Sequence, residues 1–168
     1  MRSIWIATIA LAAIGIAAAS VAESQEKKEG TFTGGYYGYG TVKATSVGEK
    51  VLVAWDENGF QLTDGFLDHT TLHCWGLEDY TNGSGQGHGY CVGVDRAGDQ
   101  FSFNLGPDEK HAPNQKSWKG SATFVTGTGK FRGITGSSEY VVHSNEFRPL
   151  AEGTYVNYVT FQGHYELP

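Results

Sequence analysis

The 168-residue sequence lacks a second long hydrophobic run, an excess of basic residues and more than two cysteines. Its one long apolar run lies at the N-terminus, so no transmembrane helix is predicted after it. Lys and Arg total 12 against 18 Asp and Glu, and the charges are scattered. That balance argues against nucleic acid and anionic membrane surfaces as partners. Two cysteines alone cannot close a zinc site.

Leu and Ala are sparse beyond the N-terminal run, and no stretch has the apolar period of an amphipathic helix. The chain is instead rich in Gly (24 residues), Tyr and Phe (9 of each), with many Thr and Val. This composition is typical of an all-β domain.

The N-terminus has the pattern of a secretory signal peptide. A short basic start, with Arg2, precedes the predominantly apolar stretch 4–19, and Ser20-Val21-Ala22 fits a small-x-small cleavage site. The alternative is a membrane anchor, but 16 residues are short for a span of about 20. We expect cleavage after Ala22 and a secreted or periplasmic protein with 11 Lys and Arg against 18 acidic residues, a net charge of −7.

The remaining chain predicts a flexible polar leader at 23–30 and a single domain at 31–168. Nine strand-like runs follow one another at short spacing and make about eight strands: 31–47, 50–56, 60–63, 68–80, 87–95, 100–105, 118–126, 138–144 and 153–165, with a hairpin turn expected between the second and third. Asn58-Gly59 is the strongest hairpin signal in the chain. The pattern fits a closed antiparallel barrel or a sandwich.

The two cysteines fall on opposite sides of a second expected hairpin. With Asn82-Gly83 as a two-residue turn, paired residue numbers sum to 165 and Cys74 lies opposite Cys91. That pair occupies a non-hydrogen-bonded position, where side chains approach closest, so a cross-strand disulfide fits. An exported chain also favours the bridge. Asn82-Gly83-Ser84 matches the N-glycosylation pattern too, although the turn explains it equally well.

In each strand the more apolar face is expected to line the interior. The residues assigned inward are Val51, Val53, Trp55, Trp75, Leu77, Tyr90, Val92, Val94, Phe101, Phe103, Leu105, Trp118, Ala122, Phe124, Tyr140, Val142, Tyr155, Val159 and Phe161, with the polar His69, Thr71, His73 and Asn157. Both cysteines then face outward. The side chains expected to line a ligand pocket are Trp55, His73, Trp75, Tyr90 and Asn157. The same list also describes an interior filled by side chains, and the sequence leaves both open.

The stretch Gly127-Thr128-Gly129-Lys130-Phe131-Arg132-Gly133-Ile134-Thr135-Gly136 places four glycines in ten residues between two strands. It resembles the G-x-G-x-F-x-G-x-x-G connection of the allene oxide cyclase-like and dirigent-like β-barrels. The resemblance extends in strand order over most of 31–168, and it favours a closed barrel over a sandwich. It also implies that homo-oligomers are possible.

No catalytic constellation is visible in the sequence. His69 and His73 are four apart, which on a strand separates them by roughly 13 Å, too far to share a metal. The turn Asp95–Asp99 does not match a calcium loop. Allene oxide cyclases cyclise a fatty-acid epoxide without a cofactor and use a buried glutamate, whereas here the expected inward faces supply no clear carboxylate. Glu139 has outward parity, and Glu49 and Glu152 lie at strand ends.

Three functions therefore remain as expectations. The first is an exported barrel that binds a small apolar or aromatic molecule in its lumen, with no cofactor and no metal. The second is a cofactor-free cyclase or isomerase, which a buried carboxylate of raised pKa beside a cavity would favour. The third is a structural or interaction module with a filled barrel.

Overall fold

The structure is a computed structural model that describes residues 28–144 and 147–168. The expected signal peptide (1–22) and the leader residues 23–27 lie outside the described residues. Lys28, Glu29 and Gly30 already belong to the first strand, so the barrel begins before the expected Thr31. Within the described ranges no helix is long and apolar enough to cross a membrane.

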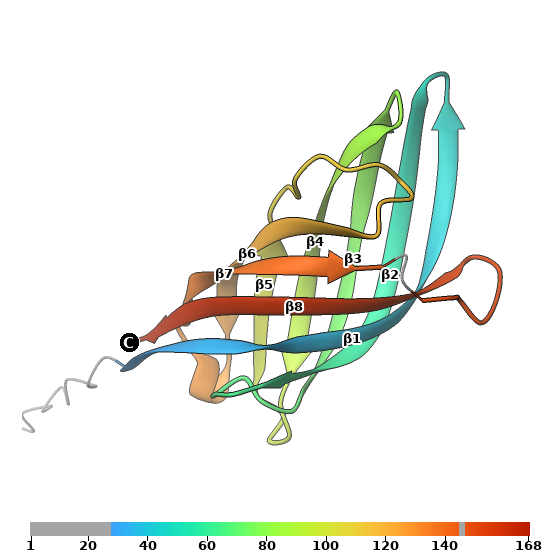
Figure 1. Cartoon of the computed structure of the whole chain (residues 1–168). Coiled ribbons are helices and arrows are strands. Elements are labelled where there is room, and N and C mark those ends of the chain that lie inside the picture. The colour runs from blue at the N-terminus through green and yellow to red at the C-terminus, as the bar shows by residue number, and fades with distance from the viewer. Residues whose placement is uncertain (1–27, 145–146) are drawn as a thin grey trace, which may run out of the picture.

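Eight antiparallel strands form one closed barrel in sequence order, with β8 paired back to β1. The elements are β1 (Lys28–Val47), β2 (Lys50–Thr63), β3 (Thr70–Thr81), β4 (Ser84–Val94), β5 (Gln100–Leu105), β6 (Ser117–Gly127), the 3₁₀ turn η1 (Gly129–Phe131), β7 (Thr135–His143) and β8 (Thr154–Leu167). Figure 1 shows the β1–β2 and β3–β4 hairpins extending well beyond the other strands. The expected all-β barrel of eight strands is confirmed.

The hairpin expected at Asn58-Gly59 is wrong, because β2 runs straight through both residues. Gly59 pairs with Gly38 of β1 and with Leu72 of β3. A Cβ atom on Gly59 would lie 2.1 Å from the carbonyl oxygen of Tyr37. The glycine therefore serves a close approach between strands, and the turn that it resembles does not form.

The second hairpin forms as expected. Asn82 and Gly83 both have positive φ, 53° and 76°, as a tight two-residue turn of this kind requires. Cys74 lies opposite Cys91 and the two form a disulfide with their Cα atoms 4.1 Å apart. The predicted register and the predicted disulfide are both confirmed.

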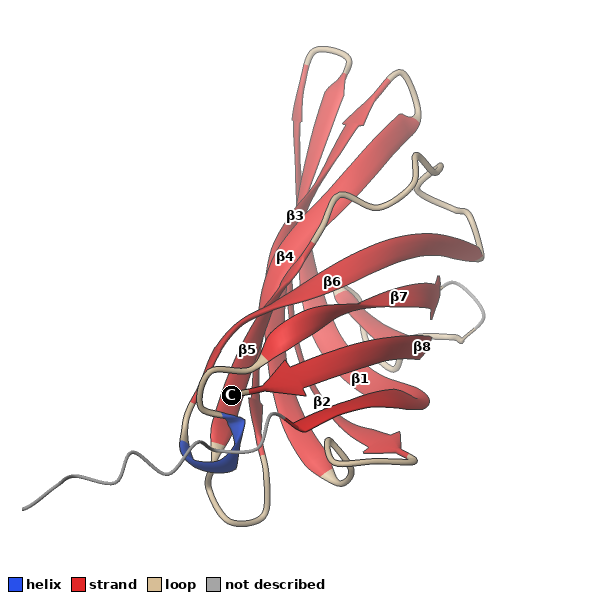
Figure 2. Cartoon of the chain, turned by 90° about the vertical axis from the view of Figure 1, so that its left-hand side faces the viewer, coloured by secondary structure: helices blue, strands red, loops and turns tan. Residues whose placement is uncertain are grey.

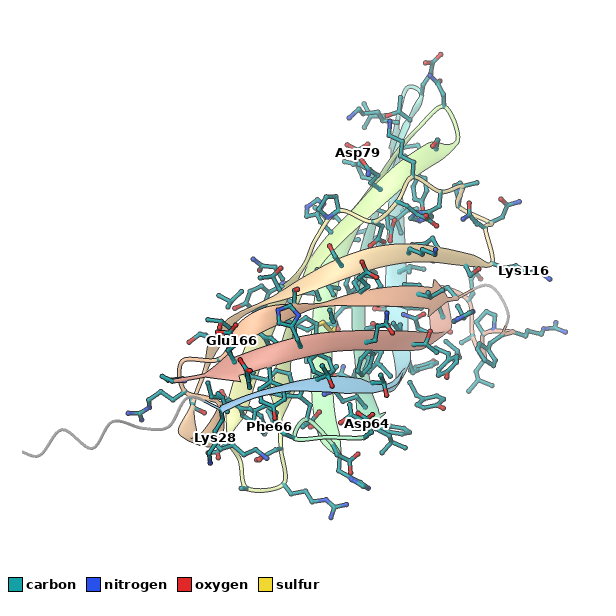
Figure 3. All side chains as sticks on the ribbon, turned by 60° about the vertical axis from the view of Figure 1, so that its left-hand side comes forward. Lys28, Asp64, Phe66, Asp79, Lys116 and Glu166 are labelled. Carbon is teal, nitrogen blue, oxygen red and sulfur yellow. A yellow bond between two sulfur atoms is a disulfide. The ribbon has the colours of Figure 1, made fainter. Side chains whose placement is uncertain are left out.

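The glycine connection and the β2–β3 connection close one end of the barrel. Phe131 of η1 is fully buried, together with Leu67 and Ile134. Phe66 packs against the rings of Phe131 and Tyr165, with centroids 5.0 and 4.3 Å apart. Figure 2 shows η1 beside the C-terminal end of β8. Figure 3 places Phe66 at the end of the molecule opposite Asp79, which lies near the tip of the β3–β4 hairpin.

Candidate functional site: the barrel lumen

Beyond the closed end the barrel contains a cavity of about 400 Å³. Its wall is mostly apolar and aromatic, and all eight strands contribute to it. The loop residues Pro113, Phe147 and Pro149 complete it. A concave, largely apolar space with a few polar groups is the usual form of a small-molecule site.

Five of the strands present the expected faces to this cavity. Its lining includes these residues assigned inward from the sequence: Val53, Trp55, Phe101, Phe103, Leu105, Trp118, Ala122, Phe124, Tyr140, Val142, Tyr155, Asn157, Val159 and Phe161. Trp55 and Asn157, two of the five residues expected to line a pocket, thus lie in the wall. Their part in binding a ligand stays a prediction.

The other three expected lining residues, His73, Trp75 and Tyr90, lie on the outer face of β3 and β4. The other residues of these two strands that were expected to face inward, Thr71, Leu77, Val92 and Val94, also lie on the outer face. His69 is exposed in the turn before β3. On the outside Trp75 contacts His73 and Tyr90, with ring centroids 5.0 and 5.4 Å apart. His73 also pairs with Asp56 at 3.1 Å.

Glycines explain why these two strands reverse their expected faces. A Cβ atom on Gly76 would lie 2.3 Å from the indole of Trp55, and one on Gly93 would lie 2.3 Å from the ring of Phe101. Rings from neighbouring strands therefore occupy the inner side of β3 and β4 at Gly76 and Gly93, where no side chain fits. Trp75 and Tyr90 face outward instead, whereas Tyr80, close to the β3–β4 turn, lies in the cavity wall.

The cysteines follow the same reversal. Cys74 and Cys91 are only 2% exposed and form part of the cavity wall. The expectation that they face outward is therefore wrong, although their pairing is right.

Glu57 of β2 is a carboxylate in the cavity wall, and it is only 5% exposed. Burial raises its pKa to about 7, against the opposing effects of the Tyr155 hydroxyl, the Asn157 amide and the Tyr36 hydroxyl. The Asn157 amide donates a hydrogen bond of 3.3 Å to Oε2. Near neutral pH this group can therefore either hold or release a proton inside the barrel.

Among the residues that the structure describes, three buried polar atoms near this carboxylate have no partner with hydrogen-bond geometry: the Tyr36 hydroxyl, Trp55 Nε1 and Asn157 Oδ1. Tyr36 and Asn157 are both close enough to influence the pKa of Glu57. Trp55 precedes Glu57 by two residues on the same strand and faces the same side. Buried polar atoms usually have partners, so an unpaired group of this kind indicates a place where a ligand or water can bind.

A second acidic group lies at the loop that follows β5. Asp108 accepts hydrogen bonds from the Tyr140 hydroxyl at 2.5 Å and from Trp118 Nε1 at 2.8 Å. Burial raises the pKa of Asp108 to about 6 despite these two bonds. Glu78, also in the wall, accepts a hydrogen bond of 3.2 Å from Tyr80.

His111 adjoins this second group and stacks on Trp118, with ring centroids 4.2 Å apart. Its Nε2 lies 3.2 Å from Glu78, and its Nδ1 lies 3.0 Å from the carbonyl of Glu109. Burial alone would lower the pKa of His111, but Glu78, Glu109 and Asp108 together raise it.

Ligand atoms of Glu78, Asp108 and His111 lie within 4.8 Å of one another. Among the described residues this is the group that could hold a divalent cation. Each member already has partners within the protein, so a cation would have to replace those bonds.

None of the three wall carboxylates was predicted from the sequence. The apparent turn at Asn58-Gly59 ended the strand one residue before Glu57, although the alternation Val53, Trp55, Glu57 continues unbroken. The inverted face of β3 concealed Glu78, and Asp108 lies in an irregular loop where no periodicity applies.

No family model and no curated protein matches this chain. A solved structure that is similar to it is that of the pterocarpan synthase dirigent protein GePTS1, with a TM-score of 0.49 and 12% identity. The match covers 85% of this chain and 93% of that one. A likeness at this level carries no information about activity, ligand or partner.

Proposed function

We propose that this protein is an exported barrel that binds a small, largely apolar or aromatic molecule in its lumen. The observation that supports the proposal is the cavity of about 400 Å³ with aromatic walls and a few buried polar groups. Disulfides form and persist in oxidising compartments, so the Cys74–Cys91 bridge fits export. The cavity argues against a barrel filled by its own side chains.

Native mass spectrometry of protein purified from its own exported fraction tests this proposal. We expect a stoichiometric small molecule that is released on unfolding. Ala122→Leu places a larger side chain in the cavity wall and should reduce retention of that molecule. Ala54→Leu makes the same change on the exposed face of β2 and is the matched control.

The proposal fails if the protein retains no molecule and binds none from a panel of lipids, phenolics and amines. Equal retention by wild type and a folded Ala122→Leu variant would place any ligand elsewhere. Should Ala122→Leu not fold, Val53→Leu probes the same wall from β2.

A second candidate function, a cofactor-free cyclase or isomerase, is favoured by Glu57. A buried carboxyl group with a pKa of about 7 beside a cavity is suited to general acid–base chemistry. The retained molecule should then be converted to an isomer of equal mass, and Glu57→Gln should slow that conversion by 100-fold or more, in the range of about 10²–10⁴ for a general acid or base. Unchanged turnover in Glu57→Gln would exclude this role.

The wall carboxylates bear on the substrate of such an enzyme. Glu57, Glu78 and Asp108 would repel a fatty-acid carboxylate within the cavity. Any isomerase activity is therefore better suited to a neutral or cationic substrate than to the fatty-acid epoxide that the allene oxide cyclase resemblance implies.

A further inference from the structure

The charges that line the cavity all have one sign. Glu57, Glu78 and Asp108 form part of the wall, and among the described residues that line it there is no Lys, Arg or His. An anionic ligand would lose its hydration there and gain no opposite charge. A cationic ligand would find both a carboxylate and aromatic rings, whose faces attract positive charge.

Of the three carboxyl groups, Glu57 is the one that lies beside buried polar atoms without partners among the described residues. Both oxygens of Asp108 accept short hydrogen bonds from the protein. Glu78 is bonded to Tyr80 and adjoins His111. The hydrogen bond to Glu57 from the Asn157 amide is long, at 3.3 Å, and the Tyr155 and Tyr36 hydroxyls also lie close enough to lower the pKa of this carboxyl group.

The unpaired polar atoms next to Glu57 indicate which hydrogen-bonding groups a ligand must present there. Asn157 Oδ1 is a buried acceptor without a donor, and it belongs to the side chain that contacts the carboxylate. The Tyr36 hydroxyl is also unpaired. A group that offers several N–H donors and a positive charge matches the carboxylate and this acceptor together.

We propose that the lumen binds an organic amine, with its ammonium group against Glu57 and Asn157 and its apolar body along the aromatic wall. This inference rests on the proposed function, because it specifies the ligand of the same cavity. Tyr36, Trp55 and Tyr155 form the aromatic surroundings of the ammonium group.

Protonation links this binding to pH. The titratable or charged groups around Glu57 are Tyr36 on β1, Asp56 on its own strand and Tyr155 on β8, while the facing residue on β3, Cys74, is held in the disulfide. Burial raises the pKa of both tyrosines, so they stay neutral near pH 7. With the pKa of Glu57 at about 7, its ionised fraction rises about tenfold from pH 6 to pH 8.

The test compares three probes with the same phenyl body: phenethylamine, 2-phenylethanol and 3-phenylpropanoate. The amine stays protonated over this pH range, as alkylammonium groups do. By calorimetry at pH 8 we expect the amine to bind at least tenfold more tightly than the alcohol, and the propanoate most weakly. The affinity for the amine should fall about tenfold at pH 6.

Glu57→Gln should remove the preference for the amine and leave binding of the alcohol intact. The matched control, Glu139→Gln, changes an exposed carboxyl group on the outer face of β7 and should behave as wild type. Asp108→Asn should lower the affinity for the amine less than Glu57→Gln does.

Several results would overturn the inference. One is tighter binding of 3-phenylpropanoate than of the amine, and another is an unchanged preference in Glu57→Gln. A preference lost in Asp108→Asn instead would assign the ammonium group to the wrong carboxyl group. Binding of the alcohol with no preference for the amine removes this inference alone, whereas binding of none of the probes, with no retained molecule, removes the proposed function as well.

Discussion

Glu57 occupies an inward position of β2 where Val53 and Trp55 precede it. Room for its side chain comes from β1: a Cβ atom on Gly38 would lie 2.8 Å from Glu57 Oε2, and one on Gly40 would lie 2.7 Å from Glu57 Cβ. The barrel therefore accommodates a carboxyl group in a largely apolar wall and carries the cost of its burial, as functional sites often do.

The pKa of Glu57 predicts a pH-dependent gain in stability on substitution by Gln. The folded-state pKa, about 7, lies above the ordinary glutamate pKa of 4.5. Stability from this group is therefore complete below about pH 4.5 and is lost as the pH rises through 7. At pH 8, Glu57→Gln should raise the free energy of unfolding by up to about 3 kcal/mol. Urea unfolding at pH 4.5 and pH 8 measures the difference.

The gain in the free energy of unfolding should largely disappear at pH 4.5, where the folded wild type and the folded Glu57→Gln variant both carry a neutral side chain at this position. Glu139→Gln on the outer face is the control and should stay within about 0.5 kcal/mol of wild type at both values. A pH-independent gain in Glu57→Gln would show that packing, and not ionisation, sets its effect.

At the scale of elements, β2 shows how glycine shapes the wall. Gly59 lets β1 and β2 approach where Tyr36 turns inward: a Cβ atom there would also lie 2.6 Å from the Tyr36 ring. A backbone carbonyl at 2.1 Å from the same point cannot rotate away as a side chain can. The strand must therefore shift if any side chain is added.

Gly59→Ala should accordingly lower the free energy of unfolding by about 2 kcal/mol, the usual cost of overpacking a close-packed site. Gly65→Ala is the matched control, since its nearest contact would be an ordinary 3.6 Å and its φ is not positive. Thermal unfolding compares the two. Equal stability of both variants would mean that the strands can separate at Gly59 without cost.

The strands also show which features of the fold could be predicted from the sequence. Alternation and turn residues were sufficient for the strand count, for the Asn82-Gly83 turn and for the faces of five strands. The same turn signal gave a wrong prediction at Asn58-Gly59. In the sequence, a glycine that is needed for close approach to a neighbouring strand cannot be distinguished from one that is needed for a turn. The inner face of β3 depends on a ring from β2 and that of β4 on a ring from β5, and no local pattern contains that information.

At the scale of the whole molecule, the barrel has one closed end and one hollow part. Phe131, Leu67 and Ile134 pack at the closed end, whereas the cavity lies in the remainder of the barrel. Strands that surround a cavity are stabilised less by interior packing than strands that surround a filled core. The disulfide between β3 and β4 lies in that wall, where a covalent link can replace missing contacts.

Removing the disulfide should therefore destabilise the whole barrel. Cys74 and Cys91 are 17 residues apart, for which chain entropy alone predicts a loss of about 3 kcal/mol. Cys74→Ala with Cys91→Ala should show that loss in urea unfolding, and ligand retention should fall with it. The double variant Leu77→Ala with His88→Ala trims another directly paired position of the same two strands, on the outer face, and is the control.

A loss below about 1 kcal/mol would show that the closed ring of eight strands holds the hollow wall in place without the cross-link. The full loss of about 3 kcal/mol, with ligand retention unchanged below the unfolding transition, would separate support of the fold from support of the cavity. The disulfide would then maintain the fold, while the shape of the cavity would depend on Trp55, Phe101 and the glycines that receive their rings.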